Sequence, residues 1–169
     1  MKVIAIDCES NGLHGKTFCI AAVIMEDGQE TNTFIGRCPI GSTVNQWVDK
    51  NVLPKMTDIP ISYVSYDELC SEYDSWYQSN KEDAIVVAHI GWPVEARFLL
   101  DAHPTPFTGP FPLEDTAPLL RGAGYDPTSE IDYVKAVKIE LPNGEQHNPL
   151  FDARLTAKVY THLMNSVNV

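Results

Sequence analysis

The apolar and polar positions in the first part of the chain follow a pattern typical of β-strands. Three apolar runs rich in β-branched residues, KVIAIDCE, TFCIAAVIM and TNTFIG, are separated by short polar segments. The second gap contains Asp27 and Gly28, and an Asp-Gly pair between apolar runs favours a tight hairpin turn. The pattern therefore predicts a three-stranded meander at the start of the chain.

The middle of the chain changes to helical periodicity. A short helix is expected within TVNQWVDKNV, capped by Ser42, and a longer one within SYDELCSEYDSWYQ, where Ser65 and Glu68 have the spacing of a capping box. The continuous apolar run AIVVAH then predicts a strand buried on both faces. A helix with Pro93 near its first turn is expected to follow.

The last third of the chain is expected to contain helices joined by loops. The proline-rich segment HPTPFTGPFP predicts a surface loop before a short helix capped by Asp115, whereas DPTSEIDYVKAVKI is ambiguous and is compatible with a helix. The segment HNPLFDARLTAKVY predicts an amphipathic helix with Asn148 as N-cap and Pro149 in the first helical position. This order of elements predicts one α/β domain over residues 1–169, with a mixed sheet flanked by helices.

Composition narrows the classes of protein that fit this fold. The formal net charge of −11 argues against a broad basic surface for non-specific nucleic-acid binding. It is compatible with an enzyme that approaches phosphate through bound divalent cations. No apolar stretch approaches the roughly 20 residues that span a bilayer, and the four cysteines are too widely spaced for a zinc knuckle. We therefore expect a soluble, cytoplasmic protein that does not associate with membranes.

Acidic residues follow two of the predicted strands and open the last helix. Asp7 and Glu9 are two residues apart on the first strand, so both side chains project from the same face. Two aligned carboxylates on so apolar a strand are costly unless a cation lies between them. Glu95 follows the buried strand, and Asp152 comes five residues after His147. Helix-dipole stabilisation remains an alternative for the last two acids, as solvent exposure does for the histidine.

This constellation resembles the DEDD-type 3′-to-5′ exonucleases, in the histidine (DEDDh) subgroup that includes ribonuclease T and oligoribonuclease. IAIDCESNGL is similar to the first motif of that family, and HNPLFDA is similar to the third. VVAHIGWPVEARFLL resembles the second motif in outline. The family usually has an aspartate five residues after an asparagine there, whereas Glu95 comes six residues after His89.

The resemblance implies a ribonuclease-H-like fold, two Mg²⁺ or Mn²⁺ ions and a set of catalytic residues. Asp7 would bridge both ions, Glu9 and Asp152 would complete one, and Glu95 would lie near the other. His147 would act as the general base that takes a proton from the attacking water. The implied reaction releases nucleoside 5′-monophosphates from the 3′ ends of single-stranded RNA or DNA.

The resemblance also implies substrate contacts in the turn SNGLHG. Backbone amides near Ser10, Asn11 and Gly12 would meet the terminal nucleotide, and Leu13 would pack against its base. The alternative is an ordinary glycine turn with an anchoring leucine. His89 either contacts substrate or merely ends its strand.

Several questions stay open from the sequence. The domain could instead be a nucleic-acid-binding or interaction module with impaired catalysis, or a phosphatase or endonuclease. The sequence does not decide between RNA and DNA, nor whether the chain forms a homodimer. Trp47, Trp76 and Trp92 are assigned to packing, with Trp92 the nearest to the cleft. Four basic residues near the third motif would neutralise only a few phosphates if they line the approach: Lys135, Lys138, Arg154 and Lys158.

Overall fold

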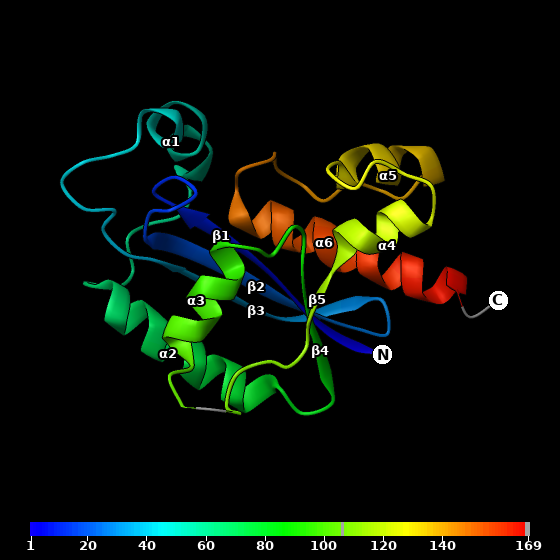
Figure 1. The fold of residues 1–169 in the computed structure, drawn as a ribbon, viewed down its shortest axis with the longest axis horizontal. Helices are drawn as coiled ribbons and strands as arrows, with labels where there is room; N and C mark the ends of the chain where they lie inside the picture. The colour runs from blue at the N-terminus through cyan, green and yellow to red at the C-terminus, as the bar shows by residue number, and fades with distance from the viewer. Residues whose placement is uncertain (106, 168–169) are drawn as a thin grey trace.

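A five-stranded mixed sheet forms the centre of the computed structural model, which describes residues 1–105 and 107–167 (Figure 1). Its strands are β1 (Lys2–Ser10), β2 (Thr17–Glu26), β3 (Gln29–Arg37), β4 (Ala84–Ala88) and β5 (Leu113–Asp115). The order across the sheet is β3-β2-β1-β4-β5, with β1 antiparallel to β2 and parallel to β4. The predicted meander and the buried strand are confirmed. The sequence did not predict β5, because three residues after a proline-rich loop carry no readable periodicity.

Helices cover both faces of this sheet (Figure 1). They are α1 (Gln46–Asn51), α2 (Tyr66–Asn80), α3 (Val94–Ala102), α4 (Thr116–Gly122), α5 (Glu130–Val137) and α6 (Pro149–Val167), with a 3₁₀ turn, η1, at Leu53–Met56. Buried side chains of α2 and α3 form one core cluster with one face of the sheet, and those of α6 form a second cluster with the other face. A third cluster joins α4 and α5 to the outer side of α6.

The alternation of side chains along β1 decides where the acids lie. Val3 and Ala5 belong to the core cluster under α6, whereas Ile4 and Ile6 belong to the cluster under α2 and α3. Because successive side chains point to opposite faces, Asp7 falls on the α6 face. The two-residue spacing places both acids on one face of the sheet, as predicted, and that is the face that α6 covers.

Two of the predicted helix caps are confirmed. The Ser65 side chain accepts a hydrogen bond from the Glu68 N–H at 3.1 Å and begins α2. The Asp115 side chain accepts from the Ala117 N–H at 2.8 Å and begins α4. Each cap satisfies a backbone donor that has no partner inside its own helix.

The predicted cap of α1 is wrong. The helix begins three residues later than expected, with Asn45 in place of Ser42 as its N-cap, and the Asn45 side chain accepts from the Trp47 N–H at 2.9 Å. The reason is a tertiary contact, since the Asn45 N–H itself donates to the side chain of Asn11 at 2.7 Å. The sequence around the helix does not identify this cap, because the contact that selects Asn45 comes from the distant β1–β2 turn.

The cysteines and the helices were also compared with the expectations from the sequence. Four buried cysteines, Cys8, Cys19, Cys38 and Cys70, are free thiols. Across residues 1–105 and 107–167, none of the helices combines the length and apolar character needed to cross a membrane.

Candidate metal-dependent active site

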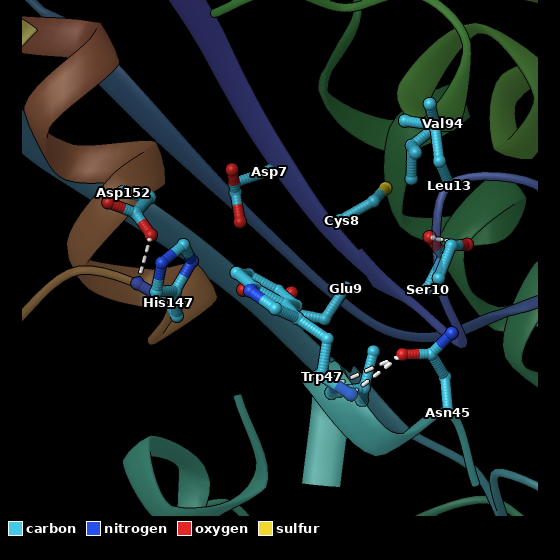
Figure 2. A pocket seen from close by; sticks show the side chains of 12 residues that line it. Asp7, Cys8, Glu9, Ser10, Leu13, Asn45, Trp47, Val94, His147 and Asp152 are labelled. Atoms are coloured by element: carbon cyan, nitrogen blue, oxygen red, sulfur yellow. Dashed lines mark hydrogen bonds between the residues drawn. The ribbon is translucent and has the colours of Figure 1, made fainter. Parts of the chain in front are cut away.

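Three carboxylates from two elements converge on one cavity at the C-terminal end of β1 (Figure 2). Asp7 and Glu9 come from β1, and Asp152 comes from the first turn of α6. The cavity has a volume of about 460 Å³, and its other walls are the turn after β1, the start of α1 and the segment before α6. Residues far apart in the sequence thus meet in one place.

The N-terminus of α6 orients both His147 and Asp152. Asn148 caps the helix as predicted, and its side-chain oxygen accepts from the Leu150 N–H at 3.1 Å. Asp152 Oδ2 accepts from the His147 backbone N–H at 2.7 Å, and His147 adopts a left-handed φ of 67°. The capping and the functional interpretations of this segment are therefore compatible, because one local structure serves both.

Burial and mutual repulsion destabilise the charged forms of these acids. Burial raises the pKa of Asp7 well above 3.8, and the negative charges of Asp152 and Glu9 raise it further. Burial raises the pKa of Glu9 to about 9 and that of Asp152 to about 7. No lysine or arginine of the described chain lines this cavity. A cation is the partner that such a cluster lacks.

The donor atoms suit a hard divalent ion. One carboxylate oxygen each from Glu9 and Asp152 and one ring nitrogen of His147 lie within 4.8 Å of one another. Asp7 lines the same cavity but lies outside this group. Oxygen-rich donor sets favour Mg²⁺ and Mn²⁺, and the imidazole nitrogen is better tolerated by Mn²⁺.

Trp47 forms part of the cavity wall beside His147. The two rings meet edge to face, with centroids 5.3 Å apart and planes at 86°. The indole is 55% exposed, so the assignment of Trp47 to packing was wrong. Burial and the positive charge of Lys55 lower the pKa of His147, which keeps the imidazole neutral near pH 7. A neutral ring can accept a proton or bind a metal ion.

Glu95, in the first turn of α3, lies next to Cys8 of β1. It is buried, it does not line the cavity, and its Oε1 accepts from the Cys8 N–H at 3.0 Å. The β1–β4 pairing ends at Ala5 and Val87, so Glu95 satisfies a backbone donor that β4 no longer reaches. Burial raises the pKa of Glu95 to about 7. Its place in a metal site stays a prediction.

The turn after β1 forms the wall opposite α6. Ser10, Gly12 and Leu13 line the cavity, and Figure 2 shows Leu13 near the start of α3, away from Asp152. Asn11 does not line it, because its side chain accepts from the Asn45 N–H and so ties the turn to α1. Substrate contacts by these four residues stay predictions.

His89 belongs to a buried polar network that the sequence analysis missed. Its Nδ1 lies 2.8 Å from Thr116 Oγ1, which donates to Glu130 Oε1 at 2.7 Å. Thr156 Oγ1 donates to the other oxygen of Glu130 at 2.9 Å. His89 does not line the cavity, so its predicted contact with substrate has no support in this arrangement. Glu130 was missed because it lies in an ambiguous segment and looks like an ordinary first-turn helix acid.

Comparisons with known proteins reveal relatives only at the level of structure. No protein-family model matches the sequence, and no curated protein matches it. Exonuclease X, solved with 5′-overhanging duplex DNA, superposes with a TM-score of 0.65 at 21% identity over 99% of this chain and 93% of its own. The fold is that of the DEDD exonucleases. The ribonuclease-H-like architecture predicted from the sequence is thereby confirmed.

Two further structures agree. Pop2p from S. pombe, solved in a form with bound Mg²⁺ and Mn²⁺, gives a TM-score of 0.72 at 12% identity over 96% of this chain and 82% of its own. E. coli exonuclease I, solved with a dT13 oligonucleotide, gives 0.67 at 13% identity over 96% of this chain but only 40% of its own. At such identities the likeness is one of fold.

The first prediction concerns repulsion in the metal-free site. In EDTA at pH 8, we expect Asp7→Asn to melt at a higher temperature than the wild type, by about 2–4 °C for each 1 kcal/mol of relieved repulsion. Because the folded-state pKa of Asp7 is raised, its destabilising effect grows as the pH rises and vanishes below the usual value of 3.8. Exposed Asp49→Asn is the control, and equal melting temperatures at pH 8 would contradict the repulsion.

The second prediction concerns Glu130. Burial raises its pKa from 4.5 to about 7, so the wild type should lose about 3 kcal/mol of stability from this group as the pH rises from 4 to 8. Glutamine has the shape of glutamate but does not titrate. The free energy of unfolding of Glu130→Gln should therefore fall by about 3 kcal/mol less than that of the wild type between pH 4 and 8. Urea unfolding across pH tests this, with exposed Glu140→Gln as control, and parallel pH profiles would refute it.

Proposed function

We propose that this protein is a metal-dependent 3′-to-5′ exonuclease that releases nucleoside 5′-monophosphates from single-stranded RNA or DNA. The observation that carries the proposal is the convergence of Asp7, Glu9, Asp152 and His147 on one cavity, in a fold shared with 3′-to-5′ exonucleases. The histidine five residues before the last acid favours the DEDDh subgroup.

Two Mg²⁺ or Mn²⁺ ions fit the chemistry of this cavity. Asp7, Glu9 and Asp152 would hold them, because no lysine or arginine of the described residues lines the cavity beside these carboxylates. Bound ions would stabilise the charge on the attacking and leaving oxygens of a phosphodiester. Glu95 would act through a water molecule, since one of its oxygens already accepts from the Cys8 N–H.

The remaining residues would position the reactants. The imidazole of His147 is neutral near pH 7, so a ring nitrogen can take the proton of the attacking water. The edge of the Trp47 ring and the hydrogen bond from the His147 N–H to Asp152 restrict where that imidazole can point. On the opposite wall, Leu13 would pack against the terminal base.

One observation favours a second function, a nucleic-acid-binding module with impaired catalysis. The fourth acid, Glu95, does not line the cavity, and its carboxylate accepts a hydrogen bond from the Cys8 N–H. If that contact excludes it from metal binding, only three carboxylates are left to hold two ions. Hydrolysis that depends on the site residues would decide for the enzyme.

The direct test is an assay of RNA and DNA oligonucleotides labelled at the 5′ end, with Mg²⁺ or Mn²⁺, resolved at single-nucleotide steps. A ladder that shortens from the 3′ end supports the proposal, and a 3′-phosphate block should stop it. Internal cleavage products would indicate an endonuclease, and no shortening at all would contradict the exonuclease.

The third prediction tests the general base. Asparagine tolerates the left-handed backbone of position 147 but cannot accept the proton, so His147→Asn should fold normally and lower kcat by roughly 10²–10⁴-fold. Calorimetric titration with Mn²⁺ should still detect binding through the carboxylates. Wild-type turnover in this variant would exclude the assigned role. His162→Asn replaces a histidine of α6 that lies outside this cavity and serves as control.

The fourth prediction separates the two roles of Glu95. Glutamine keeps the oxygen that accepts from the Cys8 N–H but carries no negative charge. If Glu95 supports an ion through water, Glu95→Gln should raise the Mg²⁺ concentration for half-maximal activity while leaving the fold intact. An unchanged metal requirement would leave Glu95 with its structural role only. Exposed Glu72→Gln is the matched control.

A further inference from the structure

A second groove adjoins the active cavity and shares Leu13 with it. The groove has a volume of about 670 Å³ and lies where the turn after β1 meets the start of α3. Its lining consists of Leu13, His14, Ile90, Trp92, Pro93, Arg97 and Leu100. A strand whose 3′ end occupies the active cavity can therefore continue across Leu13 into this groove.

The apolar side chains of the groove are unusually exposed. Trp92 is 74% exposed, Leu100 is 72% exposed and Leu13 is 60% exposed. A contiguous apolar surface of this kind marks a binding site more often than chance exposure does. The assignment of Trp92 to packing was therefore wrong, although the sequence analysis placed it nearest the cleft.

The charge of the groove suits a polyanion. No aspartate or glutamate lines it in the described structure, and its ionisable residues are His14 and Arg97. The Arg97 guanidinium donates to the Gly15 carbonyl at 2.6 Å and so fixes the turn that carries Leu13. In a chain with a net charge of −11, a groove without acidic side chains repels phosphate less than the molecule does on average.

The basic residues expected near the third motif do not offer an alternative path. Arg154 is engaged by Glu30 through two hydrogen bonds of 2.8 Å, and Lys158 donates to the Glu140 carbonyl at 2.9 Å. None of the four residues Lys135, Lys138, Arg154 and Lys158 lines the active cavity or the groove. Phosphate contacts are therefore few along this route, and affinity must come from another interaction.

We infer that Trp92 stacks on a base of the nucleotides that precede the 3′-terminal one, with Leu100 packing beside it. The inference rests on the proposed function, because it names how that same site holds its substrate. Every base has a π-face, so stacking on an indole tolerates all sequences. It also requires unpaired bases, so the groove selects single strands. Binding should then depend weakly on salt, since each phosphate contact contributes a slope of only about −0.7.

The test is equilibrium binding of 5′-fluorescein oligonucleotides, two to six nucleotides long, to the full chain with Mg²⁺. All proteins carry His147→Asn, so that the strands are not degraded. Affinity should rise when the strand becomes long enough to reach the groove. Trp92→Ala should lower the affinity for these longer strands by roughly 5- to 150-fold, and Trp92→Phe should restore most of it. Exposed Ile61→Ala should bind as the parent does.

Abasic nucleotides identify the stacked base. One abasic substitution should lower the affinity as much as Trp92→Ala does, and the two changes together should cost no more than either alone. Fully additive losses, or unchanged binding by Trp92→Ala, would overturn the inference. So would a Trp92→Ala variant that binds normally but changes from dimer to monomer in sedimentation, because the groove would then be an interface between two copies.

Hydrolysis by the otherwise wild-type chain separates this inference from the proposed function. Strand binding that depends on Trp92 without any hydrolysis would contradict the exonuclease and leave the stacking groove standing. Hydrolysis of strands that bind independently of Trp92 would contradict only the groove. Absence of both binding and hydrolysis would overturn both.

Discussion

The cost of burying like charges at the end of β1 is the constraint on which the site depends. The apolar residues of β1 make it the central strand of the sheet, and the same burial raises the pKa values of Asp7 and Glu9. Asp152 adds a third charge from α6, and the stability of the surrounding core offsets the repulsion. The molecule therefore maintains a cavity whose clustered carboxylates have no lysine or arginine of the described residues beside them.

Much of this arrangement could be predicted from local sequence because it rests on local rules. The two-residue spacing of Asp7 and Glu9 aligned them on one face, and Asn148 was recognisable as a cap. The functions of Trp47 and Glu130 were missed, since they depend on which helices pack together. Asn45 was missed as a cap for the same reason, because its backbone is held by Asn11, 34 residues away.

The segment from His89 to Glu95 departs from the usual second motif of the family, and this departure coincides with an unusual surface. Compared with the usual family spacing, one additional residue separates His89 from Glu95. Glu95 accepts a hydrogen bond from the Cys8 N–H, at a position of β1 beyond its last residue pair with β4. The same segment leaves Trp92 exposed, in a groove that shares Leu13 with the carboxylate cavity. The departure from the family pattern therefore changes both the surroundings of Cys8 and the surface next to the cavity.

The hydrogen bond between Asn11 and Asn45 joins two walls of the cavity, the turn after β1 and the start of α1. The Asn11 side chain accepts from the Asn45 N–H and donates to the Thr43 carbonyl, while Asn45 caps the helix that carries Trp47. If α1 unfolds locally, the turn that carries Leu13 loses its anchor at the same time. Local unfolding of α1 would therefore deform two walls of the cavity together, so the shape of the cavity depends on both segments being folded at once.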